Sequence, residues 1–402
     1  MFKKISLTVG ALLVLLGGGA YAVVRHLDNP ARATPIVYSN NALLLELWNN
    51  YKANNIEQSS SRTLDRSQSN ITTSEGQSYT MLRSVWMDDK KTFDDSWKFS
   101  KNNLQRKSDN LLSWKFGQKV DGSYGLLTDI GGQNTASDAD VDTALSLLMA
   151  YSRWNDPAYL YQAKQMITGI WEQEVVMVAG KPVLAANDLE KMSKDSIVVN
   201  PSYFSPYSFK LFATADTKHD WTSLTNNSYN ILTALSKSTL DSDKTSGLPP
   251  NWIKMNLITG AFIPNASPNL DTNYGYDALR TPFRLALDYQ WNKDPRDKAV
   301  LENYSFLQDT WNQDKSLKAV YKHDGSINDD YETPAMYGGS IGYYLVVHPD
   351  TAKAVYKQKL QTLYSPDRQQ WKIKLSYYDD NWAWFGIALS QNALPNLASI
   401  NN

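Results

Sequence analysis

Hydrophobic residues at helical spacing recur along most of the chain and constrain its fold more than any other feature. Their side chains lie three or four residues apart, as they do on one face of an amphipathic α-helix. The pattern occurs at residues 43–48, 82–86, 144–151, 161–170, 285–289, 301–307 and 382–389. An array of about 12 helices with short polar loops would fill the ~360 residues after residue 40. We therefore expect an all-α chain whose helices pair as hairpins in a toroid.

Composition excludes several classes of function. The 402 residues include 40 basic and 41 acidic side chains, so the formal charge of −1 gives no positive field to attract nucleic acid. Cysteine is absent, which excludes disulfides, thiolate metal sites and a thiol nucleophile. The four histidines lack the spacing of metal ligands. We expect neither a metal nor a cofactor, and chemistry that depends on carboxylates, hydroxyls, Lys or Arg.

The N-terminus predicts export from the cytoplasm. Lys3 and Lys4 precede an uncharged, largely apolar stretch over residues 5–24, which includes Ala20-Tyr21-Ala22, a sequence that fits a signal-peptidase site. The stretch is also ~20 residues long, which is the length of a helix that spans a bilayer. The chain is therefore divided into a signal peptide or membrane anchor at 1–27, a linker at 28–40 and one domain at 41–402. In both cases the domain is expected to be extracytoplasmic, either secreted or anchored to the cell membrane.

Three acidic segments lie at the predicted starts of helices. Glu75 follows Ser74 in a Ser-x-x-Gln capping pattern, and Asp138 lies in a Ser-x-x-Asp pattern before another apolar face. Asp277 precedes Pro282, which can occupy the first turn of a helix. If the inner helices of a toroid run parallel, their N-termini meet at one end. Carboxylates that are far apart in the sequence could then share one cleft.

Each of these acids also has a purely structural interpretation. An acidic side chain in a first helical turn is stabilised by ~0.3–1 kcal/mol through the helix dipole, and capping accounts for one acid per helix. Asp138, Asp140 and Asp142 alternate at the start of one helix and repel one another, so the third requires a ligand or a cation. Capping is the stronger interpretation for Glu75, Asp138 or Asp277 taken singly. When the three acids are considered together with the sequence around them, a catalytic role becomes the stronger interpretation.

The context is a family resemblance. The string Thr73-Ser74-Glu75-Gly76-Gln77-Ser78-Tyr79 resembles the acid-bearing motif of glycoside hydrolase family 8, which includes bacterial cellulases, lichenases, xylanases and chitosanases. Further segments similar to that family are residues 136–142, 200–204, 276–280 and 377–379. Thr143 departs from the family's usual Ile or Met, at a position expected to affect packing more than chemistry. The matches follow the family's order from about residue 44 to residue 386.

The resemblance implies an (α/α)6 barrel with an open cleft, and an endo-acting hydrolase that inverts the anomeric configuration. By position, Glu75 would be the general acid, Asp138 would bind the sugar at the cleavage point and Asp277 would be the general base. Some members lack an aspartate at the position of Asp277, so its presence favours the cellulase and xylanase branch. The residues that the resemblance places among the substrate-binding groups are Trp114, Tyr203, Tyr276, Arg280 and Tyr378.

An inverting pair needs one protonated and one ionised carboxyl group, ~6.5–9.5 Å apart. Arg280 and Arg284 follow Asp277 by one and two helical turns, and their positive charges are expected to keep that base ionised. The helix N-terminus opposes this role for Glu75, because it lowers the pKa of a carboxyl group that must stay protonated. We therefore expect burial against aromatic rings and the charge of Asp138 to raise the pKa of Glu75.

Three alternatives stay open at this stage. A xylanase of the same family would have the same catalytic residues. A polysaccharide lyase also uses a helical toroid but abstracts a proton with Tyr or His, and the scarcity of histidine argues against it. A non-catalytic polysaccharide-binding relative would be expected to have lost one of the acids. The expected partner is a β-1,4 or mixed-linkage glucan, bound by a monomer that contacts a membrane only through residues 5–24 if they are not cleaved.

Overall fold

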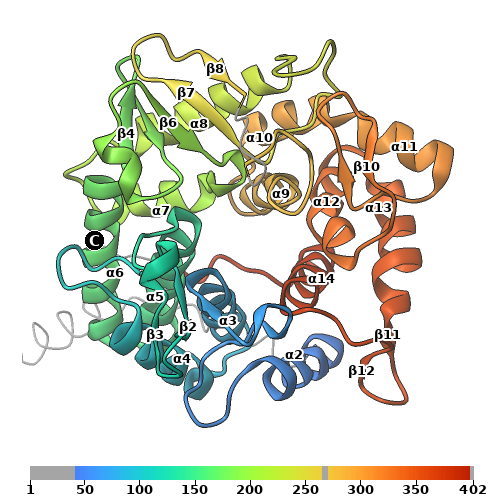
Figure 1. Ribbon diagram of the computed structural model, residues 1–402. Coiled ribbons are helices and arrows are strands. Elements are labelled where there is room, and N and C mark those ends of the chain that lie inside the picture. The colour runs from blue at the N-terminus through green and yellow to red at the C-terminus, as the bar shows by residue number, and fades with distance from the viewer. Residues whose placement is uncertain (1–40, 265–269, 399–402) are drawn as a thin grey trace, which may run out of the picture. The chain divides into compact units, whose positions relative to one another are not determined.

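Two rings of helices make up the domain, seen along their common axis in Figure 1. The computed structural model describes residues 41–264 and 270–398, all within the unit Val37–Asn402. The inner ring consists of α3 (Ser74–Trp86), α5 (Ser137–Trp154), α7 (Pro206–Ala215), α9 (Arg280–Asn292), α12 (Pro334–Val347) and α14 (Tyr377–Ser390). The outer ring consists of α2 (Ala42–Asn55), α4 (Lys90–Asn103), α6 (Pro157–Glu174), α8 (Trp221–Leu235), α10 (Pro295–Leu301), α11 (Phe306–Asp314) and α13 (Pro349–Val355).

The inner ring is closed. Each inner helix contacts the next one along the chain, and α14 returns to contact α3. Each inner helix is preceded by an outer helix that runs the opposite way, so the inner helices are parallel and their N-termini lie at one end. This arrangement confirms the predicted (α/α)6 barrel of helical hairpins.

Helix starts follow local sequence signals. Proline occupies the first turn of α6, α7, α10, α12 and α13, where its missing N–H would have had no partner within the helix. The N-cap of α3 is Thr73, whose hydroxyl accepts from the backbone N–H of Gly76 at 3.0 Å. The predicted cap at Ser74 is therefore wrong by one residue. Gln77 does not close a capping box, because its amide binds Thr63 and Ser96 instead.

The prediction of one continuous helix around residues 301–307 was wrong. The apolar pattern at residues 301–307 predicts a continuous helix, but α10 ends at Leu301, a 3₁₀ turn spans Glu302–Tyr304 and α11 begins at Phe306. Leu301, Tyr304 and Leu307 are all fully buried. Their helical spacing reflects burial in one core, which three short elements achieve as well as one long helix. The other six predicted segments lie within α2, α3, α5, α6, α9 and α14.

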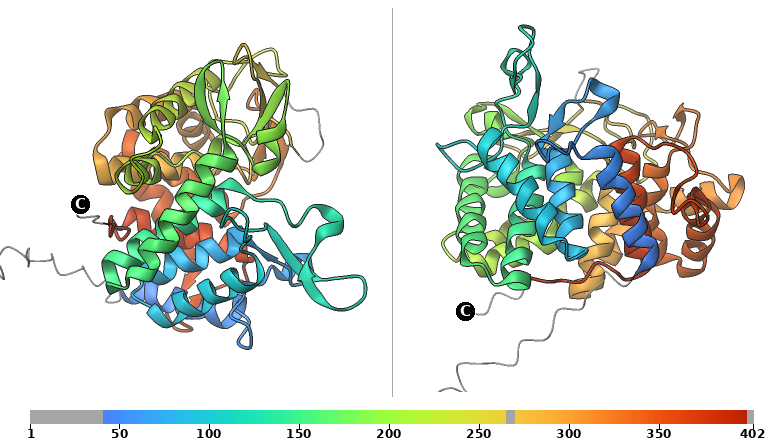
Figure 2. Two further views of the ribbon diagram at one scale, coloured as in Figure 1. Left: turned by 90° about the vertical axis from the view of Figure 1, so that its left-hand side faces the viewer. Right: turned by 90° about the horizontal axis from the view of Figure 1, so that it is seen from below.

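Five small antiparallel sheets, which the sequence did not predict, connect the helices. Their strands have two to four residues, too few to show an alternating pattern. They pair as β1 (Thr72–Thr73), β2 (Lys115–Gln118) and β3 (Tyr124–Leu126); β4 (Val175–Val178) and β5 (Lys181–Leu184); β6 (Ser196–Val199), β7 (Ile253–Asn256) and β8 (Phe262–Ile263); β9 (Val320–Tyr321) and β10 (Ile327–Asp329); β11 (Tyr364–Ser365) and β12 (Gln370–Trp371). The β2–β3 hairpin projects beyond the ends of the helices (Figure 2).

A buried arginine joins the first and last helices of the barrel. The guanidinium group of Arg83 on α3 donates to Asp380 and Asn381 on α14, both at 3.0 Å. Its carbon Cζ lies 4.2 Å from the ring centroid of Tyr51 on α2 and 4.8 Å from that of Trp384 on α14. Ionic, hydrogen-bonding and cation–π contacts therefore hold α2, α3 and α14 together where the ring closes.

The predicted export segment at 1–27 and the whole of the predicted linker at 28–40 lie outside the described residues. Within residues 41–264 and 270–398, no helix is long and apolar enough to cross a membrane.

Close contact between α12 and α14 makes a test of the packing. A Cβ atom added to Gly338 would clash with the backbone carbonyl group of Trp382. Gly338→Ala should therefore lower the free energy of unfolding by about 1–3 kcal/mol through overpacking, measured by denaturant unfolding. At an unobstructed helical position the same change stabilises by about 0.5–1 kcal/mol. An unchanged or raised stability would contradict the close approach of the two helices.

Candidate active site

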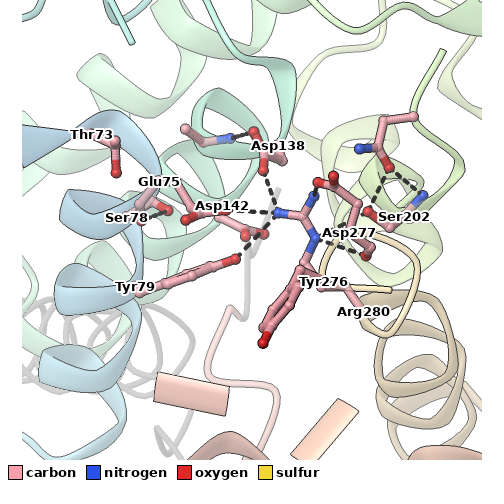
Figure 3. A network of polar contacts seen from close by, with 12 residues as sticks. Thr73, Glu75, Ser78, Tyr79, Asp138, Asp142, Ser202, Tyr276, Asp277 and Arg280 are labelled. Atoms are coloured by element: carbon pink, nitrogen blue, oxygen red, sulfur yellow. Dashed lines mark hydrogen bonds and ion pairs between the residues drawn. The ribbon is translucent and has the colours of Figure 1, made fainter. Parts of the chain in front are cut away.

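Three acidic residues from distant parts of the sequence meet at one arginine (Figure 3). The NH1 nitrogen of Arg280 donates to Glu75 Oε2 and to Asp138 Oδ2, each at 2.8 Å. The NH2 nitrogen donates to Asp277 Oδ1 at 2.5 Å. The Arg280 side chain is 1% exposed, so these ion pairs form largely out of solvent. The sequence prediction that the three acids share one place is confirmed.

The acids reach this point from the N-terminal ends of three inner helices. Glu75 lies in the first turn of α3 and Asp138 in the first turn of α5, while Asp277 precedes α9 by three residues. None of the three acids is an N-cap. The N-cap positions are Thr73, Ala136 and Leu279, and neither of the last two makes a side-chain capping bond. Capping therefore does not account for any of these carboxylates.

Glu75 has the electrostatic environment of a proton donor. Burial raises the pKa of Glu75 to about 7, Arg280 opposes this rise, and the negative charge of Asp138 adds to it. The hydroxyl group of Tyr377 donates to Glu75 Oε1 at 2.7 Å and lowers the pKa, because this hydrogen bond favours the ionised form. Burial outweighs both the arginine and the tyrosine. The expected causes of the raised pKa, burial and Asp138, are both present.

Asp138 is more deeply enclosed than Glu75. Burial raises the pKa of Asp138, and the charge of Arg280 opposes that rise. Its Oδ1 accepts from the backbone N–H of Ala139 at 2.8 Å, while its Oδ2 binds Arg280. Both oxygens are therefore fixed in position before any ligand arrives, as a rigid binding group requires.

Asp277 is held by two donors and is open to solvent. In addition to Arg280, the indole N–H of Trp252 donates to Asp277 Oδ2 at 2.9 Å. The Oδ1 atom of Asn251 accepts from the backbone N–H groups of Gly275 and Ala278 at 3.2 and 2.9 Å and so fixes the loop that carries Asp277. The Asp277 side chain is 31% exposed.

A cavity of about 240 Å³ adjoins Asp277. It is lined by Asp65, Ser67, Gln68, Tyr276, Asp277, Ser376, Tyr377 and Tyr378. Aromatic rings, hydroxyl groups and carboxylates together suit a hydroxyl-rich ligand that stacks on flat surfaces. Because Tyr377 also binds Glu75, the cavity wall contacts both ends of the carboxylate cluster.

The second arginine has a different role from the one predicted. Arg284 binds Asp142 through both terminal nitrogens, at 2.8 and 2.9 Å, and does not contact Asp277. Asp138 and Asp142 are four residues apart, as are Arg280 and Arg284, so two parallel helices form two matching ion pairs. The expectation that Arg284 supports the base was therefore wrong.

The middle aspartate of α5, Asp140, lies beside a second buried carboxyl group, that of Glu174. Asp140 Oδ1 accepts from the backbone N–H of Leu112 at 2.8 Å. Asp140 also faces Glu174, and burial raises the pKa of Asp140 well above its usual range and that of Glu174 to about 8. The expected need for a cation beside this group of acids is confirmed, because Arg280 pairs with Asp138 and Arg284 pairs with Asp142.

The predicted substrate-binding residues lie around the cluster. The guanidinium carbon of Arg280 is 5.1 Å from the ring centroid of Tyr203, a buried side chain. Tyr276 and Tyr378 both line the cavity, and the Tyr378 hydroxyl donates to the Tyr276 carbonyl oxygen. Trp114 lies farther from the acids, although its backbone carbonyl accepts from the N–H of Ser74 at 3.0 Å, directly before Glu75.

Sequence reasoning missed two residues that contact the acids. Tyr377 lies in a motif that was recognised, but only its neighbour Tyr378 was selected. Trp252 follows Pro249-Pro250-Asn251 in an irregular segment with no helical or alternating pattern. Its edge-to-face contact with Tyr203, at 5.8 Å between ring centroids, depends on the folded chain, so no local signal could have identified it.

Solved structures with a similar fold include two glucanases and a xylanase. Over 86% of this chain and 94% of the other, the structure is similar to an endo-1,4-D-glucanase from Vibrio fischeri, with a TM-score of 0.72 and 22% identity. A β-1,3-1,4-glucanase from a Paenibacillus species gives a TM-score of 0.71 at 20% identity, over 88% of this chain and 92% of that one. A cold-adapted family 8 xylanase gives 0.68 at 16% identity, over 87% and 90%. These similarities describe the fold.

Sequence comparison identifies the family. Endoglucanase 2 from Ruminiclostridium josui is 31% identical over 264 residues, which cover 63% of this chain and 51% of the relative. Endoglucanase A from Acetivibrio thermocellus is 30% identical over 268 residues, or 64% and 51% of the two chains. The aligned regions thus span about half the length of these relatives. Residues 32–377 match the family Glycosyl hydrolases family 8. The chain therefore belongs to glycosyl hydrolase family 8.

Proposed function

We propose that this chain is an endo-acting β-glucanase that hydrolyses its polymer with inversion of configuration. Glu75 acts as the general acid, Asp277 as the general base, and Asp138 binds the sugar at the cleavage point. The observation that carries the proposal is the buried arginine Arg280, which pairs with all three of these carboxylates. Membership of glycosyl hydrolase family 8 argues against the lyase, and the presence of Glu75, Asp138 and Asp277 argues against the non-catalytic relative.

Glu75 is suited to donate a proton near neutral pH. Its raised pKa keeps much of the group protonated at pH 6 to 7, where a general acid is most effective. When the proton passes to the leaving glycosidic oxygen, the new carboxylate is stabilised by Arg280 and Tyr377. The same two contacts that oppose protonation in the resting enzyme thus favour the transfer.

Asp277 is suited to activate water. Its partial exposure lets solvent reach the carboxylate, while Arg280 and Trp252 orient it. Glu75 and Asp277 bind the two terminal nitrogens of one guanidinium group, which limits the distance between their nearest oxygens. This limit is compatible with the ~6.5–9.5 Å separation of an inverting pair. Asp277 takes a proton from the attacking water, and the bond to the leaving oxygen breaks as Glu75 protonates it.

The names of the relatives support glucan as the polymer. The two sequence relatives above are called endoglucanases, and an endoglucanase from Cellulomonas uda is 25% identical over 292 residues, covering 69% of this chain and 76% of the relative. We propose that the substrate is β-1,4 or mixed-linkage glucan, and xylan is the main alternative. Extracytoplasmic action, the domain boundary at residue 41 and a monomeric state remain part of the proposal and rest on the sequence.

A panel of soluble polymers tests the proposed substrate. The purified enzyme should release reducing ends from carboxymethyl cellulose or mixed-linkage β-glucan faster than from xylan. Solution viscosity should fall early in the reaction, because an endo-acting enzyme cuts within chains. Faster release from xylan, or a viscosity that falls only in proportion to the reducing ends, would contradict the proposed substrate or the endo mode.

The role of Glu75 is tested on the best substrate of that panel. Glu75→Gln should lose ~10²–10⁴-fold in kcat, because an amide cannot protonate the leaving oxygen. Glu302→Gln is a matched control, since Glu302 is an exposed residue that pairs with Lys298 on the surface. A loss below about tenfold for Glu75→Gln, with the control unchanged, would remove Glu75 from the role of general acid.

The pH profile tests the pKa of the acid. Activity requires protonated Glu75, so kcat/KM should fall as the pH rises through about 7. Tyr377→Phe removes a hydrogen bond that favours ionised Glu75, so the alkaline limb should move to higher pH. An alkaline limb near the ordinary glutamate value, or one that moves to lower pH in Tyr377→Phe, would contradict the assigned electrostatics.

A further inference from the structure

A second and larger cavity lies beside the β1–β2–β3 sheet, outside the acid cluster. It has a volume of about 540 Å³, within the ~300–1,000 Å³ typical of ligand sites. It is lined by Glu57, Ser59, Ser60, Ser61, Arg62, Asp95, Lys98, Phe99, Asn102, Asn103, Phe116 and Tyr124. None of these residues contacts Glu75, Asp138 or Asp277, so the catalytic mechanism does not use the cavity.

Strand β2 separates the two cavities. Successive side chains of a strand point to opposite faces. Lys115 lies toward the cavity beside Asp277, because its Nζ donates at 3.4 Å to Gln68, which lines that cavity. The Nζ atom also lies 4.9 Å from the ring centroid of Trp114. The next residue, Phe116, lines the second cavity. The two cavities are therefore neighbours on opposite faces of one small sheet.

An exposed tyrosine forms a fixed platform at the second cavity. Tyr124 on the projecting hairpin is 55% exposed, although the guanidinium carbon of Arg62 lies 5.1 Å from its ring centroid. Arg62 is itself buried and held by both oxygens of Glu57, at 2.9 and 3.1 Å, and by the carbonyl oxygen of Asn70 at 2.7 Å. A ring supported in this way needs little further ordering when a flat ligand stacks on it.

The polar groups of the cavity suit an uncharged ligand rich in hydroxyl groups. Glu57 is neutralised by Arg62, and Asp95 is paired with Lys91 at 2.6 Å. Lys98 is exposed on α4. Asn102 and Asn103 follow it on the same helix and add two amide groups to the lining of the cavity. Amides and serine hydroxyls both donate and accept hydrogen bonds, as sugar hydroxyl groups do.

We propose that this cavity binds a second segment of neutral polysaccharide, with the Tyr124 ring stacked on a sugar ring. The inference rests on the proposed function only in taking the polymer to be β-glucan. Glu57 and residues 59–62 line this cavity, and Asp65, Ser67 and Gln68, a few residues further along the chain, line the cavity beside Asp277. A polymer held here therefore lies beside the cleft, which raises the local concentration of chain available for cleavage.

Affinity electrophoresis in gels that contain β-glucan tests the proposal. In the Glu75→Gln background, Tyr124→Ala should weaken retardation by the polymer at least about threefold. Asn102→Ala, which changes α4 and leaves the hairpin intact, should weaken it in the same direction. Tyr161→Ala is the matched control, because Tyr161 is 61% exposed on outer helix α6. Retardation equal to that of the control for both variants would overturn the proposal.

Hydrolysis separates this site from the cleft. With Glu75 intact, Tyr124→Ala should cleave short soluble oligosaccharides as the wild type does and lose activity only on long polymer. An equal loss on both substrates would overturn the proposal, because it would place Tyr124 in the catalytic cleft. Tyr124-dependent polymer binding by an enzyme that releases no reducing ends would refute the proposed activity and leave this site standing.

Discussion

The rest of the site depends on the ion pairs of one buried arginine. Three carboxylates at the N-terminal end of the barrel would repel one another without a positive charge between them, and Arg280 supplies it as the first residue of α9. Its own position is fixed by Ser202 at 3.0 Å and by the carbonyl oxygen of Asp277 at 3.1 Å. Removal of one partner from a buried ion pair typically costs about 3–5 kcal/mol because the remaining charge is left uncompensated, so the arginine and the carboxylates depend on one another.

This arrangement sets two requirements against each other. The arginine that gathers the acids favours their ionised forms, whereas a general acid must hold a proton. Burial and the neighbouring charge of Asp138 settle the conflict for Glu75, whose pKa lies above its ordinary value although Arg280 is 2.8 Å away. Asp277 differs because solvent reaches its carboxylate. One cation therefore pairs with two carboxylates that differ in exposure, 20% for the Glu75 side chain and 31% for that of Asp277.

Local patterns predicted the helices and the meeting of the acids, whereas the pairing of side chains was only partly predictable. Apolar spacing identified most inner helices, and parallel N-termini then brought Glu75, Asp138 and Asp277 together. The family resemblance supplied the barrel and the roles. Arg284 was misassigned because its partner, Asp142, lies on another helix, although the equal four-residue spacing of the two pairs was visible in the sequence. Trp252 lies in an irregular segment whose course only the folded chain determines.

The stereochemistry of the first product tests the central claim most directly. If Asp277 activates water while Glu75 protonates the leaving oxygen, water attacks the face opposite the leaving group and no covalent intermediate forms. Proton NMR of a fresh digest of a β-linked glucan, recorded before mutarotation, should then show the α-anomer first. An initial β-anomer would indicate retention and would contradict the roles assigned to both carboxylates.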